Sequence, residues 1–434
     1  MINSRKETVK LLCKTFSEES YSNILLDSVL SSPEMTIQDR KFITTLYYGV
    51  LEKKITLDYI ISLYSSRKPS KLDKTVLNIL RTGIYQIKYM DSVPDNAAVN
   101  ETVKLARGFR VASASGFINA VLRNFIRGGA EYSEPSDEEQ KLSVKYSVEP
   151  DIIKLVSDGY GKEFADAFFE HSLEKSPVYV RFNRAAADEE EFFRALGKTG
   201  ACRFDMLPDC YILSSGNLTG TEAFRKGYFH VQDISSQFAC AALNPKENDT
   251  VLDLCSAPGG KTFTMAQMMK GTGRVLAFDL HAHRASLIRE GAERLGLKNV
   301  TALQGDALVH NPELEGADKV LCDVPCSGLG VIRKKPEIRY KKTDDFSELC
   351  DIQFRILQNA ASYLRKGGEL VYSTCTLNRM ENDDIIDRFL AENSEFEGVS
   401  FLENSGKPFG SYKAVLGAFG PDSDGFFISK IRRK

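Results

Sequence analysis

Two cysteines lie in turns that follow predicted buried strands. Cys326 belongs to the run Asp323-Val-Pro-Cys-Ser-Gly328, and Cys375 belongs to Ser373-Thr-Cys-Thr376. A cysteine in an exposed loop can ionise and act as a nucleophile. The sequence holds nine cysteines, an odd number with no C-x-x-C pair, which favours a reducing compartment over a disulfide scaffold or a zinc ribbon. We expect the other seven, Cys202 among them, to be small buried side chains.

A glycine-rich turn follows a predicted strand at residues 250–254. It reads Cys255-Ser256-Ala257-Pro258-Gly259-Gly260-Lys261-Thr262. Gly259 and Gly260 allow the backbone to approach a ligand where the next helix starts. The turn matches neither the P-loop, whose first glycine is replaced by Cys255, nor the dinucleotide motif G-x-G-x-x-G. Lys261 opposes the helix macrodipole, so it either bends into water or pairs with a carboxylate, either the cofactor's or that of Asp323.

Two further aspartates end the next two predicted strands. Asp279 can accept hydrogen bonds from both ribose hydroxyls of a nucleoside, and Asp306 can hold an adenine amino group. Each aspartate alone is also common as a helix cap. A turn and two acids at successive strand ends indicate a nucleoside cofactor without phosphates. S-adenosyl-L-methionine fits this pattern.

Cysteine nucleophiles suit one class of methyl transfer. Carbon 5 of a pyrimidine is too weak a nucleophile to attack a sulfonium methyl, and thiolate addition at carbon 6 makes it electron-rich. A carboxyl group near N3, such as that of Asp323, stabilises the charge that develops on the ring. Methylation of nitrogen or oxygen needs no cysteine. This chemistry alone does not rank Cys375 over Cys326.

Cationic residues are concentrated in two places. Residues 1–127 hold 19 Lys and Arg residues against 12 Asp and Glu residues, although the whole chain has a formal net charge of −2. A second cluster, residues 333–342, starts with Arg333, Lys334 and Lys335. Such clusters either bind a polyanion or form a solvated surface.

Apolar spacing predicts three kinds of structure along the chain. Residues 1–127 show helical spacing throughout, and Asp39 is expected to cap one of the helices. Residues 128–143 are polar and predict a linker that leads into one more helix. Short strands and one helix at 176–232 predict a small α+β unit. Arg181 and Asn183, at the end of a strand in that unit, are candidates for contacts with a nucleic acid.

Strands and helices alternate from residue 249 onward. This rhythm predicts a mostly parallel sheet with helices on both faces, in which ligands bind beyond the carboxyl ends of the strands. The strands are expected at 250–254, 274–279, 300–304, 319–323 and 369–373. The fold is therefore predicted to be multidomain: an all-α N-terminal domain at 1–130, a small α+β unit at 131–235 and an α/β Rossmann-like domain at 236–434.

These motifs resemble a known family. Leu252–Thr262, Asp323–Gly328 and Ser373–Thr376 together resemble the RNA cytosine-5 methyltransferases of the NOL/NOP2/Sun family. Gly227–Gln237 and Asp424–Phe427 are similar to its flanking motifs. The helical domain resembles the NusB fold at Asp39-Arg40, Tyr48–Leu51, Ile79–Arg81, Pro94, Asn100-Glu101 and Phe117–Arg123. The combination is similar to the Sun/Fmu type of 16S ribosomal RNA methyltransferase.

The resemblance implies roles for matching positions. Cys375 would be the nucleophile, Cys326 would assist product release, and Asp323 would sit at the base with Lys261 beside it. Residues 255–261, Asp279, Asp306 and Asp323 would line the S-adenosyl-L-methionine site. The substrate would be small-subunit ribosomal RNA, held by the helical domain, by Arg181 and Asn183, and by Arg333, Lys334 and Lys335.

Other functions stay open at this stage. The same chemistry could act on transfer RNA or on another ribosomal RNA site. A DNA methyltransferase would use the cysteine of the Pro-Cys run, Cys326, as its nucleophile. A non-catalytic, antitermination-like RNA-binding factor would need neither cysteine.

Composition and short sequence patterns indicate the compartment of the protein and bear on whether it needs a membrane or a metal. No apolar stretch approaches the roughly 18 residues that span a membrane, and the first residues lack a signal-peptide pattern. Five histidines, of which only His281 and His283 lie close together, predict no metal site. We expect a cytoplasmic monomer that needs neither a membrane nor a metal.

Overall fold

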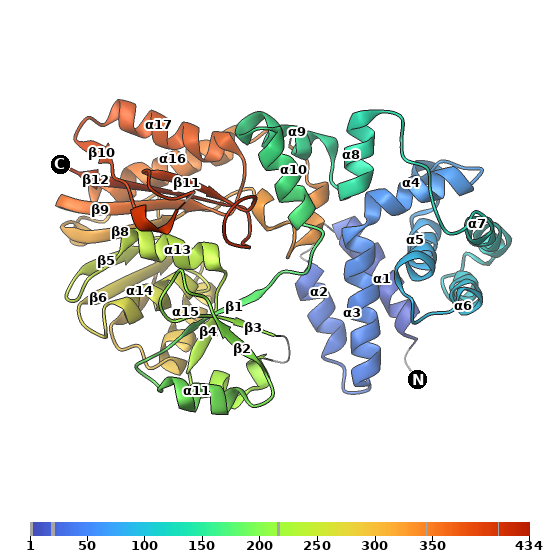
Figure 1. Ribbon diagram of the computed structural model, residues 1–434, viewed down its shortest axis with the longest axis horizontal. Coiled ribbons are helices and arrows are strands. Elements are labelled where there is room, and N and C mark those ends of the chain that lie inside the picture. Colours follow the sequence, from blue (N-terminus) through green and yellow to red (C-terminus); the bar gives the residue numbers. More distant parts are fainter. Residues whose placement is uncertain (1–2, 19–21, 215–217, 344, 407) are drawn as a thin grey trace. The chain divides into compact units, whose positions relative to one another are not determined.

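The computed structural model describes residues 3–18, 22–214, 218–343, 345–406 and 408–434. These residues form two compact units (Figure 1). The first unit comprises residues 1–154 together with 334–342, and the second comprises 155–333 and 343–434. The expected boundaries at residues 130 and 235 stay predictions.

The first unit is helical, as the apolar spacing predicted. Its helices are α1 (Ser4–Glu18), α2 (Ser22–Leu30), α3 (Ile37–Glu52), α4 (Lys54–Tyr64), α5 (Lys74–Tyr89), α6 (Asp95–Gly108), α7 (Ser115–Arg127) and α8 (Glu138–Tyr146). They share one apolar core, to which Leu46, Ile79 and Leu122 contribute fully buried side chains. The expected cap of α3 is wrong: Thr36 is the N-cap, and Asp39 closes the capping box from the third helical position.

Residues 334–342 leave the second unit and pack within the first. Their 3₁₀ helix η6 (Pro336–Tyr340) buries Arg339 to 1% exposure, and its Nη1 donates to the carbonyl of Tyr146 at 2.9 Å. The Tyr340 hydroxyl donates to the carbonyl of Leu51 at 2.5 Å. Part of the expected basic cluster is therefore structural.

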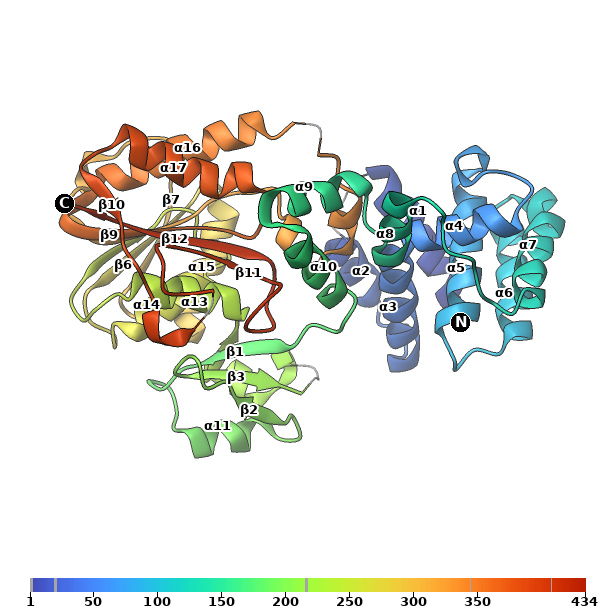
Figure 2. The same cartoon turned by 45° about the horizontal axis from the view of Figure 1, so that its top comes forward.

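The region after residue 128 is more helical than predicted. Instead of one helix after the linker there are three: α8, α9 (Pro150–Tyr160) and α10 (Lys162–His171). The small α+β unit follows, with an antiparallel sheet in the order β2-β3-β1-β4 (Figure 2). Its elements are β1 (Val178–Phe182), α11 (Glu189–Leu196), β2 (Ala201–Arg203), β3 (Cys210–Leu213), α12 (Glu222–Arg225) and β4 (Phe229–Val231).

The larger sheet carries the predicted parallel strands at its centre. Among the described residues its order is β10-β12-β9-β8-β5-β6-β7, with β11 paired to β12. The parallel strands are β5 (Thr250–Asp253), β6 (Arg274–Asp279), β7 (Val300–Gln304), β8 (Ala317–Asp323) and β9 (Leu364–Thr374). Three antiparallel strands that were not predicted extend one edge: β10 (Phe396–Gly398), β11 (Lys413–Leu416) and β12 (Phe426–Arg433).

Helices cover both faces of this sheet, as expected for strands that are apolar on both sides. The helices are α13 (Ile234–Leu243), α14 (Gly260–Met268), α15 (Ala282–Arg294), α16 (Ser347–Ser362) and α17 (Asp383–Glu392). Consecutive residues of β5 show the alternation: Val251 packs with α13, and Leu252 packs with α16 and α17. Figure 1 shows α13 and α14 on one face and α16 and α17 on the other.

Candidate functional site

The candidate site lies at the carboxyl ends of neighbouring parallel strands. β5 pairs with β6 on one side and with β8 on the other, so the strand order reverses beside it. The turn after β5, Asp323 at the end of β8 and Cys375 just after β9 share this edge. Ligands bind at such a switch point in open α/β sheets. The structure thus brings together predicted residues that lie more than 100 positions apart.

Lys261 pairs with Asp323, one of the two partners expected for it. The Lys261 Nζ lies 2.8 Å from Oδ2 of Asp323, whose Oδ1 accepts a 2.6 Å hydrogen bond from Ser373. Burial alone would lower the pKa of the Lys261 ammonium, but the charge of Asp323 and its hydrogen bond outweigh burial and raise this pKa above its ordinary value. Lys261 is therefore a fixed cation at the centre of the site.

The glycine-rich turn requires glycine where α14 begins. Gly259 has a φ of 107°, a conformation that side chains disfavour. A Cβ at this position would meet the ring of Phe263 at 2.4 Å. The turn can therefore hold Gly260 and Lys261 at the strand ends only with glycine at 259.

A cavity of about 190 Å³ lies beside this turn. Its walls are Val231, Gln232, Asp233, Ser236, Asp253, Cys255, Ser256, Ala257, Pro258, Gly260, Lys261 and Asp323. Two of these side chains leave a buried polar atom without a hydrogen bond of standard geometry among the described residues: Nε2 of Gln232 and Oδ1 of Asp253. A donor and an acceptor match the carboxylate and the ammonium of the amino-acid tail of S-adenosyl-L-methionine.

Neither Gln232 nor Asp253 was predicted from the sequence to have a role in the site. The signal for Asp253 was its position as the last residue of β5, just before the turn. Burial raises the pKa of Asp253 to about 7, against the effect of a 2.6 Å hydrogen bond from Thr262. A nearby cation would favour its charged form.

Asp279 and Asp306 lie where the strand pattern placed them. Asp279 ends β6, is 4% exposed, and lies 3.3 Å from Nη1 of Arg284. Asp306 lies two residues beyond β7 and lines a second cavity of about 210 Å³, together with Leu254 and Phe278. The two cavities flank the end of β5, because Leu254 lines the second cavity and Cys255 lines the first. Their polar and apolar walls fit the tail and the adenine of the cofactor.

The two candidate cysteines face each other. Their Sγ atoms lie 3.2 Å apart, and both side chains are partly exposed. Among the other cysteines, Cys210, Cys240 and Cys322 are buried as predicted. The prediction for Cys202 is wrong, because it lies exposed on the edge strand β2.

Different charges accompany the two thiols. The Lys261 ammonium interacts electrostatically with Cys375, which favours a thiolate there. The hydrogen bond with Cys375 and burial hold the pKa of the Cys326 thiol well above its ordinary value, and the charge of Glu381 adds to this. A protonated Cys326 can therefore donate a hydrogen bond to the sulfur of Cys375.

Two glycines let backbones cross behind the cysteines. Gly330 donates from its N–H to the carbonyl of Cys375 at 3.0 Å, and its own carbonyl accepts from Gly425 at 2.9 Å. A Cβ on Gly330 would lie 1.8 Å from the carbonyl oxygen of Gly425. The Asp424–Phe427 motif therefore supports the Cys375 turn through its backbone.

Arg181 and Asn183 occupy buried positions. Arg181 is 6% exposed and donates to the carbonyl of Pro208 at 2.9 Å. Asn183 is fully buried, and its Nδ2 donates to the carbonyls of Gly227 and Leu295. The structure gives both a structural role and does not bring them to the cysteines. Their contact with RNA stays a prediction.

The basic cluster divides after its first residue. Arg333 donates to the carbonyls of Glu174 and Lys175 and pairs with Asp422 at 2.5 Å. Lys334 and Lys335 are exposed and belong to the helical unit. Contacts of these three residues with RNA stay predictions.

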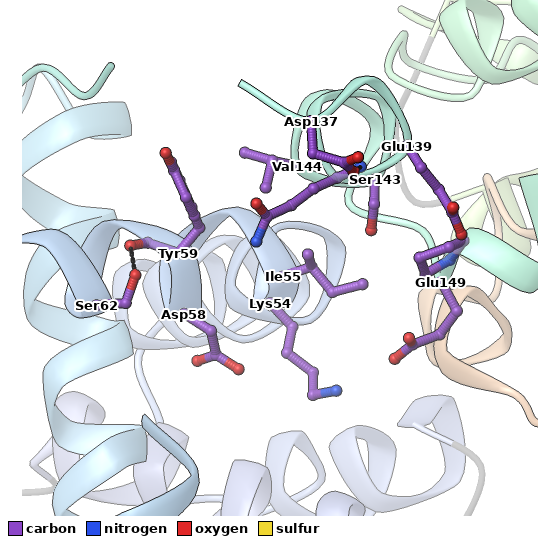
Figure 3. Close-up of a pocket in the computed structure, with 12 residues that line it drawn as sticks. Lys54, Ile55, Asp58, Tyr59, Ser62, Asp137, Glu139, Ser143, Val144 and Glu149 are labelled. Atoms are coloured by element: carbon purple, nitrogen blue, oxygen red, sulfur yellow. Dashed lines mark hydrogen bonds between the residues drawn. The ribbon is translucent and has the colours of Figure 1, made fainter. Parts of the chain in front are cut away.

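A further cavity lies within the helical unit. It measures about 620 Å³ and is lined by residues of α4 and α8 and by Glu149 (Figure 3). Within the described part of the chain, no group of three or more His, Cys, Asp and Glu side chains could hold a metal ion. Over the same residues, no helix is both long and apolar enough to cross a bilayer.

Known proteins share this organisation. The model of the family described as 16S rRNA methyltransferase RsmB/F matches residues 240–432, and that of the NusB family matches 2–127. The chain is 38% identical to "Probable ribosomal RNA small subunit methyltransferase B" of Bacillus subtilis, over 99% of this chain and 98% of that one. It is 31% identical to the protein of the same name in Synechocystis, over 100% of both chains. The crystal structure of PH0851 matches it with a TM-score of 0.81 at 26% identity, over 100% of this chain and 99% of that one.

Proposed function

Because this chain belongs to the ribosomal RNA small subunit methyltransferase B family and uses S-adenosyl-L-methionine, we propose that it methylates carbon 5 of a specific cytosine in 16S ribosomal RNA. One observation carries the choice of carbon 5: two cysteines 3.2 Å apart, with a lysine beside one and a glutamate beside the other. A carbon that must first be activated needs a covalent nucleophile, which a thiolate supplies.

Residues of the two cavities, together with Asp279 at the end of β6, would hold the cofactor. Asp253 and Gln232 would bind the ammonium and the carboxylate of its tail, Asp279 its ribose, and Asp306 its adenine. When bound, S-adenosyl-L-methionine supplies an electrophilic methyl group. The turn at 255–260 would let the backbone approach it closely.

Cys375 would open the reaction. Its thiolate, stabilised by Lys261, adds to carbon 6 of the cytosine, and a Cys375–carbon 6 bond forms as the ring double bond breaks. As carbon 6 is attacked, N3 of the ring takes up a proton from water, and the carboxylate of Asp323, held by Lys261 and Ser373, accepts a hydrogen bond from that N3–H. Carbon 5 thereby becomes the nucleophile for methyl transfer. The proton on N3 returns to water when the ring double bond forms again.

Cys326 would assist the closing step. After methylation, the carbon 5 proton passes to water, the ring double bond forms again, and the bond between Cys375 and carbon 6 breaks. The thiol of Cys326 donates a hydrogen bond to the departing sulfur, which the 3.2 Å separation permits. Loss of this thiol would leave RNA attached to the protein.

The choice of 16S ribosomal RNA as the substrate rests on the names of the relatives and on the positive charge of the helical part of the chain. The relatives are named for ribosomal RNA of the small subunit, and the helical part of this chain is rich in Lys and Arg. Cations bind RNA phosphates with a strong dependence on salt. The target base would have to leave any stack to reach the cysteines.

A methyl-transfer assay tests the proposal. Labelled S-adenosyl-L-methionine is incubated with the protein and with protein-free 16S ribosomal RNA, transfer RNA or DNA. We expect label on carbon 5 of one cytosine of 16S ribosomal RNA, and none with Cys375→Ala. Label on transfer RNA alone would keep the chemistry and refute the substrate. Label on a nitrogen or an oxygen, or RNA binding without cofactor binding, would refute the proposed reaction.

A further inference from the structure

Two consecutive buried residues each contact a different cysteine loop. Glu381 ends the 3₁₀ helix η7 (Arg379–Glu381), and Asn382 precedes α17. Both side chains are fully buried, although both belong to residue types that are mostly exposed. Burial of a carboxylate is costly unless several hydrogen bonds satisfy it. The partners of these two residues therefore indicate what they hold in place.

Glu381 holds the loop that carries Cys326. Its Oε2 accepts 2.8 Å hydrogen bonds from the backbone N–H of Ser327 and from Nε2 of Gln353. Its Oε1 accepts from the Ser327 hydroxyl at 2.5 Å. Gln353 also donates to the carbonyl of Pro325 at 2.9 Å. The residues on both sides of Cys326 are thus tied, directly or through one side chain, to one carboxylate.

Asn382 holds the turn that carries Cys375. Its Nδ2 donates to the carbonyl of Thr376 at 3.0 Å, and its Oδ1 accepts from the hydroxyl of Thr374 at 2.5 Å. The same Nδ2 donates to the hydroxyl of Tyr160 at 2.9 Å. Asn382 therefore contacts the residues immediately before and after Cys375, but it carries no charge.

Hydrogen bonds also join the two loops directly, among them the 3.0 Å bond from the N–H of Gly330 to the carbonyl of Cys375. The hydroxyls of Ser327 and Thr376 lie 2.6 Å apart. In addition, each loop forms hydrogen bonds with its own member of the pair at 381–382. Two residues adjacent in sequence thus hold two loops that lie about fifty positions apart, beside the bonds that join the loops directly.

We propose that Glu381 and Asn382 are positioning residues with separate roles: Glu381 places Cys326 for product release, and Asn382 places Cys375 for attack on carbon 6. The proposal rests on the function proposed above. Beside the hydrogen bond with Cys375 and burial, the charge of Glu381 contributes to raising the pKa of the Cys326 thiol, which favours the protonated form that donates to the departing sulfur. Asn382 orients the nucleophile without changing the charge beside it.

The two roles predict opposite defects. With Glu381→Gln, attack and methylation proceed, but elimination of the Cys375 sulfur is slowed by about tenfold to a hundredfold, the effect of losing hydrogen bonds to a charged group. RNA covalently attached to the protein then accumulates. With Asn382→Ala, attack is slowed by a similar factor, so methyl transfer falls and no adduct accumulates.

A single-turnover experiment separates these outcomes. Full-length protein is mixed with 16S ribosomal RNA and labelled S-adenosyl-L-methionine, and denaturing gels score adduct and free methylated RNA over time. The quantity of interest is the ratio of adduct to transferred methyl, which does not depend on the fraction of folded protein. Glu392→Gln on α17, where Glu392 pairs with Arg388 at the surface, is the matched control and should behave as wild type. Glu381→Asp keeps the charge and should restore part of the release.

The results distinguish the two proposals. A high ratio in Glu381→Gln, a low ratio in Asn382→Ala and a partial return in Glu381→Asp would support the separate roles. Equal ratios in all variants, with wild type and Cys326→Ala behaving as proposed, would overturn the positioning roles alone. Absence of both methyl transfer and adduct from wild type and Cys326→Ala would instead refute the proposed function.

Discussion

A cysteine follows β8 and another follows β9, but the charged residues near the two thiols differ. The strands are parallel neighbours, and a cysteine follows each. Cys375 interacts with the Lys261 cation, whereas Cys326 lies near the Glu381 anion. The reactivity of a thiol follows its thiolate character. The comparison teaches that two identical side chains at neighbouring strand ends can differ in the charges around them, and the proposed roles of the two cysteines rest on that difference.

The largest effect should come from removing the sulfur at the end of β9. Cys375→Ala should lower methyl transfer to 16S ribosomal RNA by at least about 10³-fold, because the alternative path lacks covalent activation of carbon 5. Cofactor binding should stay intact, since Cys375 does not line the cofactor cavity. Methyl transfer from labelled cofactor measures the first quantity and equilibrium dialysis the second. Substantial activity in this variant would reverse the assignment of the two cysteines.

The next effect should come from the cation that distinguishes the two sulfurs. Lys261→Met should lower the rate by about 10²-fold to 10³-fold, the range for loss of a preorganised charged group. The rate should also reach half its maximum at a higher pH, because the thiolate of Cys375 loses its counter-charge. A pH profile of single-turnover methyl transfer tests this. An unshifted profile would mean that Lys261 pairs with Asp323 and has no effect on the ionisation of Cys375.

Removing the other sulfur should change the product and not only the rate. Cys326→Ala should still attack and methylate, but turnover should fall by about 10²-fold, the usual contribution of a positioned proton donor. RNA should remain attached to the protein on denaturing gels. Clean release of methylated RNA at the wild-type rate would remove Cys326 from the mechanism.

A smaller effect should come from the cofactor cavity. The pKa of Asp253 is raised to about 7 by burial, so it is charged above this pH and neutral below it. If it binds the cofactor ammonium, affinity should fall about tenfold from pH 8 to pH 6. Asp253→Asn should abolish this dependence, and Asp205→Asn, at an exposed position, should retain it. Calorimetric titration with S-adenosyl-L-methionine measures both. A pH-independent wild type would place the ammonium elsewhere.

The smallest effect concerns the basic cluster. Replacement of Lys334 and Lys335 by Ala should weaken RNA binding a few-fold and lower the slope of log affinity against log salt by about 2. Filter binding at several salt concentrations gives that slope. Arg333→Ala should instead lower thermal stability, because Arg333 makes three contacts within the protein. An unchanged slope in the double lysine variant would identify the cluster as a solvated surface.

Local patterns located several candidate site residues at the strand ends where the structure has them. Strand ends followed by Gly259, Asp279 and Asp306 could be located from sequence, because each depends on a few neighbouring residues. The pairing of Lys261 with Asp323 was one of two alternatives, and the unfavourable position of a cation at a helix start gave the signal. The ranking of the cysteines required the resemblance, and the structure adds a physical reason.

The features that could not be predicted from the sequence depend on packing between segments far apart in the chain. Glu381 lies in a polar run that suggests only a helix start, and its role depends on a loop more than fifty positions earlier. Arg339 is a cation in a basic run, yet its side chain is buried and donates a hydrogen bond to the carbonyl of Tyr146. The strands β10, β11 and β12 are short or follow irregular loops. Both β10 and β11 pair with β12, and β12 pairs with β9, which lies earlier in the chain. Such features depend on contacts that local spacing does not encode.

The most direct test of the account is to identify the sulfur that carries the RNA. Cys326→Ala is incubated with 16S ribosomal RNA and cofactor, the adduct is digested with protease and nuclease, and the modified peptide is sequenced by mass spectrometry. The account predicts a methylated cytosine on the peptide that contains Cys375, and no adduct in the double variant that also carries Cys375→Ala. In parallel, Cys375→Ala alone should form no adduct. A nucleotide attached to Cys326 in that single variant would contradict the central claim.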